Sequence, residues 1–193
     1  MTQPVDPNEV LMTGENSFIR LSSDDGESLS DRLSHWRVLW CPAGAGHALF
    51  IQSEVTGGEF QIYSDNIAVA RWLQRTIESV LYPAFGDTTV PVRAADFERQ
   101  GDPRSTVTEL IETDEELIRM AWYDCLPAFV ITSPPGTGGR EIGVYSTFFP
   151  ARSAQVSLND HVAGGSPRKE MRGDRESSSA VLAWSETWVA PRS

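Results

Sequence analysis

The chain has 193 residues and a formal net charge of −11, with 40% hydrophobic and 22% charged residues. We expect one domain over residues 1–193, because a single core becomes efficient above about 100 residues and splits only beyond roughly 250. This ordinary composition excludes a disordered or fibrous chain. The negative charge disfavours nucleic acid and anionic membranes as partners, since both repel an acidic surface.

The first residues, MTQPVDPNEVLMTGENSF, are acidic and contain proline. They lack the basic start and apolar centre of an export signal, and no apolar run approaches the roughly 20 residues that cross a bilayer. Cys41 and Cys125 are too few and too far apart for a disulfide scaffold. We therefore expect a cytoplasmic protein in which residues 1–34 form a polar N-terminal tail or wrapping segment.

Strand patterns begin at HWRVLWC, where Trp36, Val38 and Trp40 fall on one face at period two. HALFIQSEV predicts a second strand. A Gly57-Gly58 turn then leads into a third strand, EFQIY, as expected for a hairpin.

One amphipathic helix is predicted at about residues 66–81. Ser64, Asp65 and Asn66 are N-cap candidates, and Pro83 and Gly86 end the pattern. Apolar side chains recur at helical spacing, and the opposite face is polar. The apolar stripe comprises Val69, Trp72, Leu73, Thr76, Ile77 and Val80, and the polar face carries Arg71, Gln74, Arg75 and Glu78.

From residue 88 onward the sequence repeats short strand patterns, interrupted by a long polar loop at about 161–178. Eight or nine short strands at this spacing favour a barrel or sandwich. The predicted fold class is mostly β (α+β): an antiparallel β-barrel or strongly curved sheet, lipocalin-like in outline. Such an architecture does not fix function.

Common catalytic motifs are absent from the sequence. PPGTGGR (134–140) lacks the lysine of a phosphate-binding loop and precedes a strand. The chain has no G-x-S-x-G or G-x-G-x-x-G motif. His35, His47 and His161 lie in separate segments without metal-ligand spacing. We expect neither a metal nor another cofactor.

The last strand pattern, AVLAWSETWVA, carries the most specific chemical signal. Strict alternation places Leu182, Trp184, Glu186 and Trp188 on one side, with a carboxylate between two indoles. If this side faces inward, desolvation raises the pKa of Glu186 and makes it a general acid or base. In the alternative, the other side is the core face and the indoles form an outer aromatic ladder.

Two further strands mix apolar and polar groups. Ile118, Met120, Trp122 and Asp124 share one face by alternation, and Tyr145 could donate a hydrogen bond to a ligand. The candidate catalytic residues are therefore Glu186, Asp124 and Tyr145, and the candidate substrate-binding residues are Trp184, Trp188, Trp122, Arg119 and Trp40.

The preferred hypothesis is a cofactor-independent acid/base enzyme of the hydratase, dehydratase, isomerase or cyclase type. It would act on a small apolar or aromatic metabolite in a barrel cavity, as a monomer or homodimer. One alternative is a small-molecule-binding protein with the same pocket and no chemistry. The other is a protein-interaction module whose acidic surface attracts a basic partner.

Overall fold

The computed structural model describes residues 9–23 and 28–191. Strands account for most of this part of the chain, and they are β1 (Val10–Ser22), β2 (Leu29–Trp40), β3 (Gly46–Gln52), β4 (Phe60–Ser64), β5 (Val92–Ala94), β6 (Asp96–Asp102), β7 (Thr106–Glu112), β8 (Leu117–Cys125), β9 (Phe129–Ser133), β10 (Gly143–Leu158), β11 (His161–Val162), β12 (Ser166–Pro167), β13 (Lys169–Arg172), β14 (Arg175–Ser178) and β15 (Ala180–Val189).

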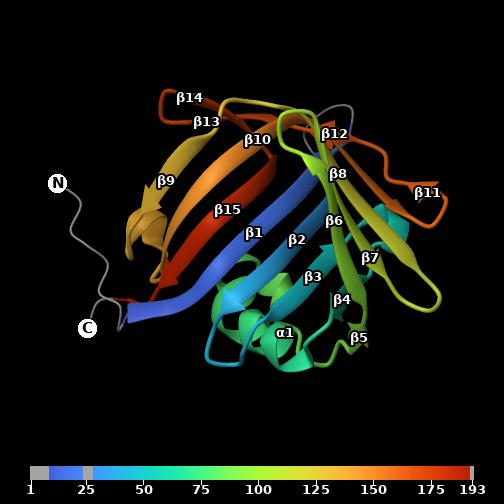
Figure 1. Ribbon diagram of the computed structural model, residues 1–193, viewed down its shortest axis with the longest axis horizontal. Helices are drawn as coiled ribbons and strands as arrows, with labels where there is room; N and C mark the ends of the chain where they lie inside the picture. The colour runs from blue at the N-terminus through green and yellow to red at the C-terminus, as the bar shows by residue number, and fades with distance from the viewer. Residues whose placement is uncertain (1–8, 24–27, 192–193) are drawn as a thin grey trace.

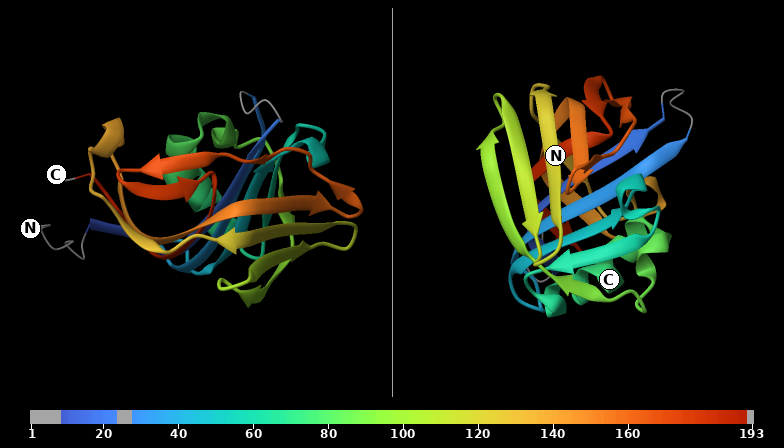
Figure 2. Two further views of the ribbon diagram at one scale, coloured as in Figure 1. Left: turned by 90° about the horizontal axis from the view of Figure 1, so that it is seen from above. Right: turned by 90° about the vertical axis from the view of Figure 1, so that its right-hand side faces the viewer.

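A 13-stranded sheet curves into a nearly closed barrel, which confirms the predicted fold class (Figure 1). Its strands follow the order β5-β4-β3-β2-β1-β15-β10-β8-β7-β6, and β9, β11 and β12 pair at its margins. All pairs are antiparallel except β4 with β5. The strands β6, β7 and β8 cross over β1, β2 and β3, while the helix lies outside the barrel (Figure 2).

The N-terminal segment is not a tail where the structure describes it, so this expectation was wrong. β1 lies between β2 and β15 at the centre of the sheet. Sequence analysis did not identify β1 as a strand because polar residues interrupt its hydrophobic pattern. Two of these residues, Asn16 and Ser17, are nevertheless buried. The expected loop at 161–178 likewise contains the short strands β11 to β14, of which β13 and β14 form a separate hairpin.

The helical segment matches the predicted range. It comprises α1 (Ile67–Leu73), a π-helical segment (Gln74–Glu78) and α2 (Ser79–Leu81). Asn66 caps its start by accepting hydrogen bonds from the amides of Ala68 and Val69. A short 3-10 turn (Pro83–Gly86) follows.

The expected polar face of the helix is incorrect at Gln74 and Glu78, which are both fully buried. Both residues lie in the π-helical segment, where an extra residue per turn rotates the following side chains away from ideal helical spacing. Val80, predicted on the apolar stripe, is 45% exposed.

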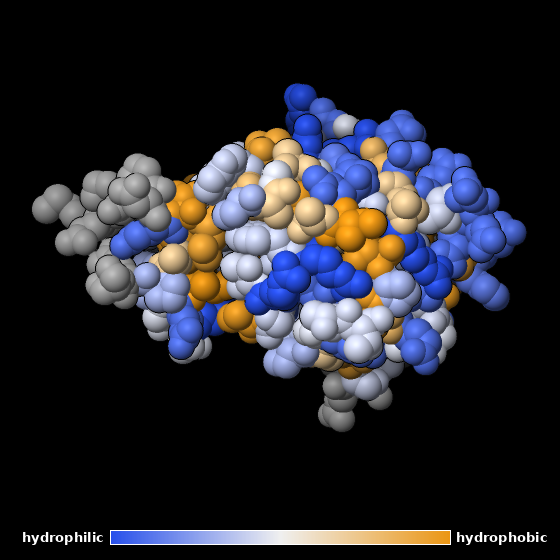
Figure 3. Space-filling view, turned by 90° about the horizontal axis from the view of Figure 1, so that it is seen from below, coloured by the Kyte–Doolittle hydropathy of each residue, from blue (hydrophilic) through white to orange (hydrophobic). Residues whose placement is uncertain are grey.

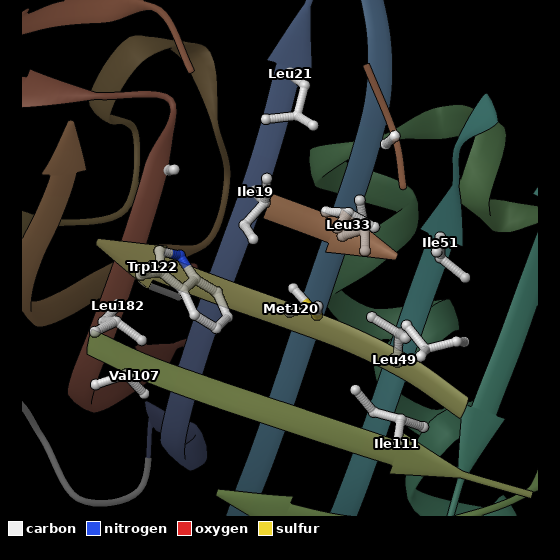
Figure 4. Packing of buried hydrophobic residues seen from close by; sticks show 14 of the residues in the cluster. Ile19, Leu21, Leu33, Leu49, Ile51, Val107, Ile111, Met120, Trp122 and Leu182 are labelled. Atoms are coloured by element: carbon white, nitrogen blue, oxygen red, sulfur yellow. The ribbon is translucent and has the colours of Figure 1, made fainter. Parts of the chain in front are cut away.

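Apolar side chains fill both sides of the sheet. Inside the barrel, Trp122 and Met120 of β8 pack between strands β1 to β3 and β15 (Figure 4). On the outer side, Trp36 and Phe50 pack beneath the helix with Leu73 and Ile77. The core therefore has two layers separated by strands β1, β2 and β3.

The surface carries scattered apolar residues. Seen from below, they form several separate patches among hydrophilic ones (Figure 3). Leu39 and Val130 are the most exposed large examples on β2 and β9, at 62% and 73%, and Trp40 is 50% exposed. Within the described residues, no helix combines the length and apolar character needed to cross a membrane.

Candidate functional site

The last strand does not keep one face, contrary to the strict alternation expected for Leu182 to Trp188. Leu182 and Trp184 face the barrel interior, whereas Trp188 packs in the outer layer. A β-bulge causes this switch: Thr147 pairs with Trp184 and Tyr145 with Thr187, so that Ser185 and Glu186 lie together opposite a single residue of β10. Ser185 adopts the left-handed conformation, with φ of 54°.

The bulge turns Glu186 and Trp188 toward a large cavity, which we call the outer pocket. Its volume is about 1010 Å³, and its floor is formed by β1, β10 and β15. The end of the helix, strand β9 and the β13–β14 turn form its walls. The walls and floor are rich in aromatic side chains, namely Phe18, Tyr82, Phe129 and Phe148.

Glu186 is 3% exposed and contributes to the floor of this pocket. Burial raises the pKa of its carboxyl group to about 8, although the neighbouring Trp188 and Ser146 side chains oppose the rise. The indole Nε1 of Trp188 donates a hydrogen bond to Glu186 Oε2 at 2.8 Å. At neutral pH the group therefore carries a proton that it can donate.

A second buried carboxyl group is connected to the outer pocket by hydrogen bonds. Asn16, which lines the pocket, donates from Nδ2 to Ser34 Oγ at 2.9 Å. Ser34 and the Trp36 indole both donate to Glu78 Oε1. Burial raises the pKa of Glu78 to about 7, against the effect of these two hydrogen bonds. Sequence reasoning missed Glu78, because regular helical spacing assigns it to the exposed face.

Arginine side chains surround the pocket. Arg20, Arg140, Arg172 and Arg175 contribute to its lining, together with the carboxylate of Asp174. Arg20 also lies 5.0 Å from the ring centre of Phe18 and 3.5 Å from Glu170. Since Glu186 is protonated at neutral pH, positive charge exceeds negative charge around the opening.

The other predicted site residues do not join Glu186 and Trp188. Trp122 is buried in the barrel, where its Nε1 donates to the Phe18 carbonyl at 3.2 Å. Asp124 is exposed and has a φ of 52°, so it does not continue the face of Trp122 as expected. Tyr145 is half-buried, Arg119 and Trp40 are exposed, and Trp184 stacks against Arg99 on the inner side.

Within residues 9–23 and 28–191, no group of three or more His, Cys, Asp or Glu side chains is arranged to hold a metal ion. No protein-family model matches the chain, and neither a curated protein nor a solved structure matches it. Function is therefore inferred from the chemistry of the outer pocket.

Proposed function

We propose that the protein is an acid/base enzyme that converts a small apolar or aromatic molecule in the outer pocket. The observation that carries this proposal is a carboxyl group, 3% exposed, at the floor of a cavity of about 1010 Å³. A desolvated acid in an aromatic pocket is a typical arrangement for general acid/base catalysis. The ligand is assigned to the outer pocket rather than to the barrel interior because Glu186 faces outward.

Glu186 is the proposed catalytic residue. Its pKa of about 8 makes it a proton donor at neutral pH, and its conjugate base accepts a proton in the reverse step. Asn16 also lines the pocket, and its Nδ2 donates to Ser34 and to the His35 carbonyl, so its amide oxygen is the atom proposed to orient a polar substrate group. Hydration, dehydration, isomerisation and cyclisation require little beyond positioned acid and base groups, so these are the proposed reaction classes.

The walls suggest the substrate's shape and charge. Phe18, Phe129 and Phe148 offer aromatic faces to an apolar body. The arginines at the opening favour an anionic substituent, which guanidinium groups bind through charge-assisted hydrogen bonds. We further propose, from the sequence, a cytoplasmic monomer or homodimer.

The Glu186→Gln variant tests this assignment. Binding is measured with 8-anilinonaphthalene-1-sulfonate, an aromatic anion that fluoresces in apolar sites, and turnover by mass spectrometry on a panel of unsaturated and aromatic acids. We expect the variant to retain affinity for the dye within about threefold. Its turnover should fall by about 10²-fold or more, because the proton donor is removed.

Glu112→Gln is the matched control, since Glu112 is an exposed carboxylate on β7. It should leave both binding and turnover unchanged. Full turnover by Glu186→Gln would refute the catalytic assignment.

A non-catalytic binding protein is the second candidate, because the aromatic walls and arginine-rich opening are sufficient for binding an apolar anion. In that case panel compounds displace the dye without forming product. Glu186→Gln then changes affinity only modestly, while Trp188→Ala weakens it.

A further inference from the structure

A second polar cavity lies on the opposite side of β1 and β2, and we call it the inner pocket. Its volume is about 250 Å³. Strands β2, β3, β6 and β7 supply its side chains, which are His35, Arg37, His47, Phe97, Arg99 and Glu109.

His35 is buried in this pocket without a hydrogen-bond partner. It is 1% exposed, and neither ring nitrogen is bonded to any residue in the described part of the chain. The nearest carboxylate oxygen, Glu109 Oε1, is 3.8 Å from Nδ1, which exceeds hydrogen-bonding distance. Burial and the positive charge of Arg99 lower its pKa, so the imidazole is neutral at pH 7 and offers one N–H donor.

Arg99 provides the second free donor. Its Nη1 lies 2.7 Å from Glu15 Oε2, and its Nε donates to Glu109. Its Nη2 is buried and has no partner among the described residues. A guanidinium group cannot accept hydrogen bonds. The unpaired Nη2 donor of Arg99 can therefore be satisfied by a ligand that carries hydrogen-bond acceptor atoms.

The cavity has flat walls. The rings of His47 and Phe97 are 5.2 Å apart and 15° from parallel, and those of His35 and Phe97 are 5.6 Å apart at 30°. This volume lies below the range of about 300–1000 Å³ typical for drug-sized ligands. These aromatic rings favour a small ligand that carries a flat ring of its own.

We propose that the inner pocket binds a small planar carboxylate whose oxygens accept hydrogen bonds from Arg99 Nη2 and the His35 ring. Arg37, which is 48% exposed, adds a second guanidinium at the mouth. The carboxylates of Glu15 and Glu109 are held by Arg99, and that of Asp65 by His47 Nδ1 at 2.7 Å. The site is separate from Glu186 and independent of the proposed catalysis.

Binding should be accompanied by proton uptake. Burial raises the pKa of Glu109 to about 7 despite Arg99. A ligand carboxylate beside it raises that pKa further, since like charges disfavour ionisation. The groups that face Glu109 are Arg99, His35, Arg37 and Glu15.

Isothermal titration calorimetry with benzoate tests the proposal, with neutral benzamide as the comparison ligand. We expect benzoate to bind at least tenfold more tightly than benzamide. Titration at pH 7 in two buffers of different ionisation enthalpy should show proton uptake. Equal binding of the two ligands, or no binding of benzoate, would overturn the proposal.

Three variants assign the binding to this pocket. His35→Phe and Arg99→Lys should each weaken benzoate binding at least tenfold, because each removes a free donor while keeping a ring or a charge. Arg104→Gln is the matched control, as Arg104 is 91% exposed beside β6 and should not alter binding. His35→Phe should fold with unchanged or greater stability, because it removes unpartnered buried nitrogens.

Trp188→Ala separates this site from the outer pocket, because Trp188 lines only the outer one. It should weaken dye binding and bind benzoate like the wild type. Two outcomes would place benzoate in the outer pocket and refute the inner site. One is unchanged benzoate binding by His35→Phe. The other is a variant that loses the binding of benzoate and of anilinonaphthalene sulfonate together.

Discussion

The backbone conformation of Ser185 determines the face of the sheet on which the Glu186 side chain lies. A non-glycine residue with φ of 54° is unusual in a strand, because the left-handed conformation brings Cβ close to the following carbonyl. The bulge that contains it separates Trp184, on the inner face, from Glu186, on the outer face. One backbone conformation thus places the acid in the outer pocket.

The first prediction concerns this residue. Ser185→Gly should maintain or raise stability by up to about 1 kcal/mol, because glycine adopts a positive φ without strain. Ser185→Val should lower stability by about 1–3 kcal/mol, since a β-branched residue is strained there. Urea unfolding measures both, and equal stability of the two variants would contradict the assigned conformation.

The face of Glu186 could not be predicted from sequence alone. Period-two alternation gave the correct side for Leu182 and Trp184 but failed after Ser185, because no glycine marks the bulge. The same failure occurred at Asp124, whose φ is also positive. A raised pKa of Glu186 was expected only for a side chain that faces the barrel interior, whereas burial at the floor of the outer pocket raises it.

At the scale of elements, the helix was predictable in extent because its signals are local: an Asn66 cap, an apolar stripe and a terminating proline. Its buried polar face was not, because π-helical geometry arises from contacts with the sheet and the following turn. Gln74 illustrates this. Its Nε2 donates to the carbonyl oxygens of Phe85 and Asp87, each at 2.9 Å.

Gln74 should therefore hold the turn after the helix. Gln74→Ala removes both hydrogen bonds and leaves buried carbonyl groups unsatisfied, so we expect a loss of about 1–3 kcal/mol in unfolding free energy. Arg75→Ala is the control, because Arg75 is next to Gln74 and its side chain is exposed. This variant should change the unfolding free energy by less than about 0.5 kcal/mol. An unchanged unfolding free energy in Gln74→Ala would show that the turn is held by other contacts.

At the scale of the whole molecule, three buried acids shape the pH dependence of stability. Burial raises the pKa values of Glu78 and Glu109 to about 7 and that of Glu186 to about 8. The folded state therefore keeps protons that the unfolded state releases near pH 4.5. The stability contributed by these protonated groups is fully present below pH 4.5. It is lost as the pH rises through the pKa values that the three acids have in the folded protein.

We expect the unfolding free energy to be lower at pH 8 than at pH 6.5, with each acid contributing up to about 1.4 kcal/mol per pH unit. Below pH 6.5 the lowered pKa of His35 acts in the opposite direction, because the unfolded chain then binds the extra proton. Urea titrations of the wild type and Glu78→Gln measure the effect. The variant should show a shallower dependence, and Glu112→Gln should not.

The barrel-like architecture was predictable from the number and spacing of short strand patterns. Strand β1 was not, because buried polar residues such as Asn16 and Ser17 interrupt its hydrophobic pattern. Asn16 lines the outer pocket. A position that hid β1 from sequence analysis thus belongs to a candidate site.

The filled barrel separates two tasks in a way useful to protein engineering. Methionine and leucine side chains in its interior can be repacked to raise thermal tolerance without contacting a molecule bound beside Trp188, because the sheet lies between them. Access to that molecule can in turn be altered through the β13–β14 turn, which is exposed and contributes to the opening without belonging to the interior. The outer pocket and the scaffold can accordingly be altered in independent rounds of selection.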